Sequence, residues 1–291
     1  MDNGKFDLDK YNEEQHEYLG MTVFWEVMSC NIPVDVTFQA LSDCGFGSGF
    51  IKNPTPRKAF GKAARVIEGS NKHKIARKIS DTPQKAVIGI VGESKDIENE
   101  SLSYRQEATV RLNKETGSLD WFGDSSLGDE FKKIYERALV TIDEIEFRSF
   151  AKRVFEDNNG IMIRDQGGVY FILRKDEERI FAVDKMFREL GIGKIGIIRA
   201  VNGALERRGT WDSFVDNFNE RVGETLKKIR GIGKRAACLA KHEDRLDEIK
   251  KMADVYIVLC EEEEEVENIR KILEDAGNEI TAKMVELSEV K

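Results

Sequence analysis

Apolar positions along the chain change between strand-like and helix-like spacing, and this change of period divides the sequence into regions. The first region, 19–125, begins with a run of bulky residues over 21–28 that is typical of a strand. A short helix after Pro33 and a basic helix over 57–68 follow, and then strands over 86–91, 104–112 and 119–122. This order predicts an α+β domain.

The second region, 126–200, combines helical and strand periods. Helical spacing runs from about 129 into the 150s and stops at Asn158-Asn-Gly160. Two strands, 161–164 and 169–174, flank a glycine turn and predict a β-hairpin, and a helix over 183–190 follows. The order helix, hairpin, helix predicts a second α+β domain, and it is also the order of a winged DNA-binding module with the hairpin as the wing.

The third region, 201–291, has only helical spacing. One apolar stripe runs from Trp211 to Ile229, and apolar residues then step by three and four from Leu246 to Cys260. After the glutamates at 261–265 the stepping resumes one residue out of phase, so this run is either a solvated helix face or a short break. An unbroken helix from about 235 to 276 would span roughly 60 Å. The pattern predicts an antiparallel helical coiled-coil arm.

Composition and charge narrow the class of protein. The chain has 291 residues, a net charge of −8 and 40% hydrophobic residues, which is enough for a folded core. No apolar run is long enough to cross a membrane, and residues 1–18 form a polar leader that we expect to be disordered rather than a signal peptide. We therefore expect a cytoplasmic protein, in the host cytoplasm if it is viral, with no membrane partner.

The residues that carry common catalytic chemistry are not spaced for it. The four cysteines and three histidines are scattered without metal-ligand spacing, and no Gly-x-Ser-x-Gly elbow is present. Gly191-Ile-Gly193-Lys-Ile-Gly196 matches a dinucleotide fingerprint but follows an expected helix, which favours a helix C-cap and a turn. We expect no cofactor, no metal and no enzymatic activity.

One segment is strongly basic. Residues 52–78 contain nine lysines and arginines and a single acid, Glu68, in a chain that is acidic overall. Such a segment can neutralise phosphates of DNA or RNA, dock on an acidic partner or simply solvate a helix. The candidate nucleic-acid contacts here are Lys58, Lys62, Arg65, Lys72, Lys74, Arg77 and Lys78.

A second candidate contact lies at the glycine turn around residue 231. The run 229–237 resembles the hairpin of helix-hairpin-helix DNA-binding proteins, and Lys234 and Arg235 would be its weaker phosphate contacts. The alternative is a plain turn between two coiled-coil helices. From Glu243 onward, 16 acids face seven bases, so the C-terminal arm should repel nucleic acid. Residues 211–280 suit a protein partner or self-association.

Three motifs resemble those of an uncharacterised protein family found in phages, plasmids, bacteria and archaea. They are Val23-Phe-Trp25, the Pro-Arg-x-Ala-Phe sequence at 56–60 and the Gly-Gly-Val-Tyr-Phe sequence that begins at Gly167. The resemblance covers the chain from about residue 20 to the C-terminal helices. It implies a strand-first domain, a hairpin, a coiled-coil end and a phage or plasmid accessory protein, and it brings no catalytic residues.

These observations lead to two hypotheses. The first is a non-enzymatic accessory protein of a phage or other mobile element that binds protein partners and, through the basic segment, nucleic acid. The alternative is a structural, self-associating scaffold protein that acts through its coiled-coil arm without binding nucleic acid.

Overall fold

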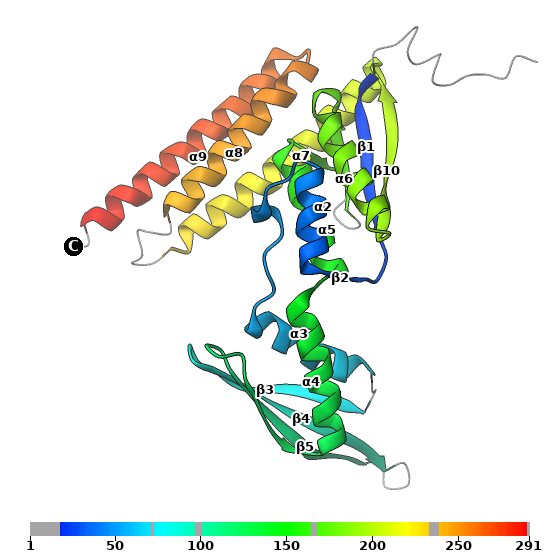
Figure 1. Cartoon of the computed structure of the whole chain (residues 1–291). Helices are drawn as coiled ribbons and strands as arrows, with labels where there is room; N and C mark the ends of the chain where they lie inside the picture. The colour runs from blue at the N-terminus through cyan, green and yellow to red at the C-terminus, as the bar shows by residue number, and fades with distance from the viewer. Residues whose placement is uncertain (1–17, 71–72, 97–100, 164–167, 233–238, 290–291) are drawn as a thin grey trace, which may run out of the picture. The chain divides into compact units, whose positions relative to one another are not determined.

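The computed structural model describes residues 18–70, 73–96, 101–163, 168–232 and 239–289. Within them the chain is an α+β protein with eight α-helices and three antiparallel sheets, which confirms the predicted fold class at that level (Figure 1). The chain forms two compact units. Unit 1 combines Met1–Val27 with Arg148–Lys291, and unit 2 is Met28–Phe147. This division differs from the three consecutive domains that the sequence pattern indicates. The expected leader lies, apart from Tyr18, outside the described residues.

The elements of each unit are as follows. Unit 2 contains β2 (Asn31–Pro33), α2 (Val34–Asp43), α3 (Pro56–Ser70), β3 (Lys74–Asp81), β4 (Lys85–Asp96), β5 (Ser101–Asn113), β6 (Leu119–Gly123), α4 (Ser125–Val140) and β7 (Thr141–Asp143). Helix α5 (Glu144–Asp157) crosses the boundary between the units. Unit 1 contains β1 (Tyr18–Val27), β8 (Ile161–Met162), β9 (Val169–Leu173), α6 (Glu177–Glu189), β10 (Gly193–Val201), α7 (Ala204–Arg230), α8 (Leu239–Tyr256) and α9 (Glu263–Glu289).

Strand β1 lies inside the four-stranded sheet of unit 1, whose order is β10-β1-β9-β8. Val23 pairs with Ile197 on one side and with Tyr170 on the other, both in antiparallel register. Met21 and Val23 are fully buried on one face, because alternate residues of a strand point to the same side. The predicted first strand is confirmed, and its partners come from far along the chain.

The connection from α6 to β10 depends on glycine. Gly191 follows the end of α6 with a φ of +63°, and Gly193 opens β10 with a φ of +147°. A Cβ atom at Gly193 would lie 1.8 Å from the carbonyl oxygen of Glu26, so the strand pairing requires glycine there. The expected helix C-cap and turn are confirmed. Strand β10 itself was not predicted, because Gly193 and Gly196 interrupt its apolar pattern.

Helices α7, α8 and α9 pack together around one apolar core (Figure 1). The rings of Phe214 and Tyr256 stack with their centroids 5.2 Å apart. The ring centroids of Trp211 and Phe214 are also 5.2 Å apart. The buried Tyr256 hydroxyl donates a hydrogen bond to the carbonyl oxygen of Asn159 at 2.9 Å. The predicted C-terminal helices are confirmed, but three helices share this core rather than the two of a coiled-coil hairpin.

The long helix expected from about 235 to 276 is interrupted at its glutamate run. A short 3-10 turn, Ile257–Leu259, separates α8 from α9. Arg208 of α7 lies 3.4 Å from the Glu262 carboxylate and 3.0 Å from that of Glu265, which also accepts a hydrogen bond from the Trp211 indole. The glutamate run therefore lies at a break, and three of its members are held by α7, since Arg207 also pairs with Glu261 at 3.5 Å. The break explains the phase slip.

The helix expected from about 129 into the 150s is also divided. Its middle, β7, leaves helical conformation and pairs with β2, so that Ile142 lies opposite Ile32. The Asp143 carboxylate then accepts hydrogen bonds from the backbone N–H groups of Ile145 and Glu146, both at 3.1 Å, and starts α5. Helical spacing continues across the break, so the pattern alone does not show it.

The larger sheet of unit 2 has the order β3-β4-β5-β6, and α3 and α4 cover one of its faces (Figure 1). Phe60 of α3 and Phe131 of α4 meet edge to face above the sheet at 5.5 Å. Ile90 and Val110 are the fully buried centre of the sheet beneath them. Strand β3 was not predicted, because its basic residues hide its apolar alternation.

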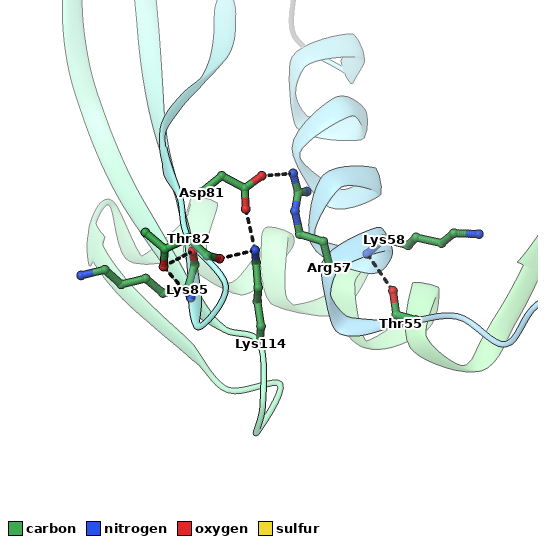
Figure 2. A network of polar contacts seen from close by, with 7 residues as sticks. All are labelled: Thr55, Arg57, Lys58, Asp81, Thr82, Lys85 and Lys114. Carbon is green, nitrogen blue, oxygen red and sulfur yellow. Dashed lines mark hydrogen bonds and ion pairs between the residues drawn. The ribbon is translucent and has the colours of Figure 1, made fainter. Parts of the chain in front are cut away.

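Asp81 connects three parts of unit 2, as Figure 2 shows. Its carboxylate accepts a hydrogen bond from the Arg57 guanidinium, at the start of α3, and another from the Lys114 ammonium, after β5, both at 2.6 Å. The Lys114 and Arg57 hydrogen bonds lower the pKa of Asp81 from 3.8 to about 2. The folded unit thus favours the ionised carboxylate.

The stability of unit 2 should therefore depend on pH through Asp81. The contribution of its ion pairs is fully present above pH 3.8 and is lost as the pH falls through about 2, because the unfolded chain binds the proton first. Urea unfolding of the wild type and of Asp81→Asn should show a difference in unfolding free energy that shrinks over this range. In a Lys114→Met background, the difference in unfolding free energy caused by Asp81→Asn should be smaller. A difference that does not vary with pH would contradict the role of the Asp81 ion pairs.

Candidate nucleic-acid interface

A cavity of about 470 Å³ runs along the solvent side of α3 in unit 2. Its floor is apolar and includes Pro54, Ala59, Ala138 and Ile142. Five cationic side chains line the same cavity: Lys52, Arg57, Lys58, Lys62 and Arg65. Because α3 buries Phe60, Ala63 and Ile67 in the core, helical spacing places its cations on the opposite face.

Two carboxylates at the start of α5 and the end of β7 pair with cations of α3. The Lys58 ammonium lies 2.7 Å from the Glu146 carboxylate, and the Lys62 ammonium lies 3.0 Å from that of Asp143. Lys62 also donates a hydrogen bond to the side-chain oxygen of Asn31 at 3.0 Å. These contacts make Lys62 part of the structure of unit 2 as well as of the cavity.

Asp143 is the more buried of the two carboxylates. Burial by itself would raise the pKa of Asp143, but the hydrogen bonds from Lys62 and from the backbone of Glu146 outweigh it and lower the pKa. Folding therefore favours the ionised form of the Asp143 carboxylate, which pairs with the Lys62 ammonium.

Two lining cations are left for an external ligand. Within the described part of the chain, neither Lys52 nor Arg65 makes an ion pair with a carboxylate. Five cations face two acids, Asp143 and Glu146, among the described residues that line the cavity, so this lining carries a net positive charge. A positively charged rim above an apolar floor suits an anionic ligand that also has an apolar part.

The structure brings together only some of the predicted contact residues. Lys58, Lys62 and Arg65 line the cavity, and the structure adds Lys52 and Arg57 to them. The other predicted residues lie elsewhere: Lys74, 3.5 Å from the Glu107 carboxylate, together with Arg77 and Lys78, is on β3, whereas Lys72, Lys234 and Arg235 lie outside the described residues.

Sequence reasoning did not find the acidic residues of the cavity. Asp143 and Glu146 lie about eighty positions after the basic helix, in a stretch expected to be one continuous helix. The only signal for them was the short polar interruption around 141–144, which helical spacing on both sides conceals. The division of that helix places them beside α3.

Two further findings bear on the class of protein. Among the residues that the structure describes, no group of three or more His, Cys, Asp or Glu side chains is placed to hold a metal ion. None of the described helices is long and apolar enough to cross a membrane.

The fold and the site define an α+β protein with a cationic cavity in one of its two compact units. The chain belongs to a family of unknown function, DUF6744, whose model matches residues 18–287. No curated protein and no solved structure matches the chain. The predicted membership of an uncharacterised family is thus confirmed, and its phage or plasmid origin stays a prediction.

The two ion pairs of the cavity should differ in their effect on stability. Lys62→Met leaves the mostly buried Asp143 without its cation and should lower the free energy of unfolding by about 1–3 kcal/mol. Lys58→Met breaks a more exposed pair and should change it by less than about 1 kcal/mol. Urea denaturation followed by circular dichroism measures both, and equal effects would argue against a structural role for Lys62.

Proposed function

We propose that this protein is a non-enzymatic accessory protein of a phage or other mobile element, and that it binds nucleic acid through the α3 cavity of unit 2. The observation that carries the proposal is the gathering of five cations of one short segment around a single cavity. Phosphate groups are the most widespread anionic ligands for such clusters, and lysine and arginine neutralise them without reading sequence.

Lys52 and Arg65 are the proposed primary phosphate contacts, since they have no carboxylate partner among the described residues. Lys58 is half exposed and can exchange Glu146 for a phosphate at little cost, because an exposed ion pair contributes little free energy. Lys62 is held by Asp143 and Asn31, so we assign it to the support of the cavity. The apolar floor would contact sugars or bases.

The alternative is a structural scaffold protein, and a feature of unit 1 favours it. A groove of about 630 Å³ runs between α8 and α9, with Leu246, Leu273 and Ile280 among its lining residues. Four acids and two bases surround this apolar strip: Glu243, Asp247, Asp254, Glu274, Lys250 and Arg270. A further helix, from a protein partner or a second copy, could pack there within the predicted interaction region 211–280.

Binding of labelled single-stranded and double-stranded DNA and RNA, measured by fluorescence anisotropy over a salt series, tests the nucleic-acid proposal. The wild type should bind at low salt and weaken steeply as salt rises. Reversal of Lys52 and Arg65 to Glu should weaken binding to each DNA and RNA probe. The slope of log affinity against log salt concentration should fall by about one for each lost phosphate contact. Reversal of Lys132 and Lys133 to Glu, on the exposed side of α4 and outside the cavity lining, is the control with the same change of charge.

The triple change of Lys58, Lys62 and Arg65 to Glu should abolish binding, provided that circular dichroism shows the variant to be folded. The Lys52 and Arg65 variant does not disturb an ion pair among the described residues and so remains interpretable if the triple variant unfolds. Absence of wild-type binding at low salt, or unchanged binding by the Lys52 and Arg65 variant, would refute the proposal. Sedimentation equilibrium of the wild type would then test the scaffold function, and a strictly monomeric protein would argue against self-association.

A further inference from the structure

The four-stranded sheet of unit 2 has a second face that α3 and α4 do not cover. Ala86, Ile88 and Ile90 of β4 point into the helix-covered core, so the alternate residues Val87, Gly89 and Val91 point to the opposite side. Among the described residues, the core cluster that contains α3 and α4 includes Ala86, Ile88 and Ile90 but not Val87, which is buried on the other side of the sheet. The opposite side, termed here the open face, lies away from these helices (Figure 1).

The strand register places large apolar side chains on the open face. Phe122 of β6 pairs with Thr109 of β5, which in turn pairs with Gly89 of β4, and Tyr104 of β5 pairs with Glu93 in another row. Phe122 is 54% exposed and Tyr104 is 58% exposed. Exposed aromatic rings on a sheet surface are typical of binding sites, because removing their apolar surface from water on binding is favourable.

The Ile79 side chain covers Gly89 at the centre of the open face. Gly89 has no side chain, and an added Cβ atom would lie 3.1 Å from the Ile79 side chain, which leans over it from β3. Ile79 is itself 57% exposed. Thr109 is the next residue across the sheet. Ile79 and Phe122 are therefore exposed apolar side chains on either side of Gly89 and Thr109.

Cations border these apolar side chains. The Arg111 guanidinium lies over the Phe122 ring at 5.6 Å, and Arg77 shares the row of Gly89, Thr109 and Phe122. Lys85 precedes Val87 on the same face, and Figure 2 shows its side chain directed away from α3. The acids that register places here are Asp120 and Glu93, so bases outnumber acids on this face.

We propose that the open face binds single-stranded nucleic acid, with bases stacked on Phe122 and Tyr104 and phosphates near Arg77, Lys85 and Arg111. Aromatic rings and guanidinium groups can both stack on an unpaired base, because every base has a π face. The two rings are separated by five residues of β5 register, about 15 Å, so each would hold a different base of one strand.

A base-paired duplex is a poorer occupant of this surface. Its bases are stacked on one another and cannot lie on a protein ring unless they are flipped out at a cost. A protein partner would use the same apolar area, but it would need no planar ring at position 122. The charge excess and the cation above Phe122 favour an anionic strand over an apolar protein surface.

This inference deepens the proposed function, but it rests on a different surface. The α3 cavity lies on the helix side of the sheet, and the open face is on the other side of the same sheet. A variant on one side therefore leaves the residues of the other in place. Failure at one surface can be distinguished from failure at the other.

The test compares Phe122→Leu with Phe122→Trp in the full-length protein. Labelled oligothymidylate and a hairpin duplex of equal length are the probes, and anisotropy gives the affinities over a salt series. Leucine keeps an apolar side chain but removes stacking, so it should weaken binding to oligothymidylate by about fivefold to a hundredfold with an unchanged salt slope. Tryptophan should preserve that affinity, and duplex binding should not change in either variant.

Tyr104→Leu and Tyr104→Phe form the second pair, with the same expectation. Because the side chains at both positions, 104 and 122, are exposed, the four variants should fold like the wild type, and circular dichroism checks this. Oligothymidylate affinity that is equal in the leucine and aromatic variants would overturn the proposal while leaving the α3 cavity intact. If the leucine variants changed the sedimenting mass of the protein and left the oligothymidylate affinity unchanged, the open face would be a contact between two copies of the chain. That result would also overturn the proposal.

Discussion

The pairing of β1 with β9 and β10 is the constraint on which the division of this chain into two compact units depends. A strand formed by the first described residues closes a sheet with residues beyond 168, so all of Met28–Phe147 must leave unit 1 and return. The entropy cost of closing a loop grows only slowly with its length, so a complete folded unit fits between the paired strands. Gly193 allows the closest approach of β10 to β1.

Within unit 2, the cations of one segment have two kinds of role. Arg57, Lys62 and Lys74 pair with carboxylates of other elements and so help to fix α3 and β3 in place. Lys52 and Arg65 make no such pair among the described residues. Asp81 and Asp143 act in the same way at the two sides of α3, because each carboxylate accepts hydrogen bonds from more than one donor. Charge density in a sequence therefore overstates the charge available to a ligand.

The candidate site was only partly predictable. The basic helix and its amphipathic spacing indicated Lys58, Lys62 and Arg65, because residues three and four apart share a helix face. Asp143 and Glu146 could not be found, since their position beside α3 depends on the pairing of β7 with β2. The open face of the sheet was hidden for a similar reason: Arg77 and Phe122 share a row only through two intervening strands.

The sequence by itself determined the local elements with strong periods: β1, the glycine turn after α6, the basic helix α3, the strands β4 to β6 and the apolar stripe of α7. These depend on spacing, propensity and glycine conformations, which act over a few residues. The tertiary structure decided where the long helical patterns break, which strands pair and which charges are neutralised. Those outcomes depend on contacts between residues distant in the chain, such as Trp211 with Glu265 or Lys62 with Asp143, and no local pattern encodes them.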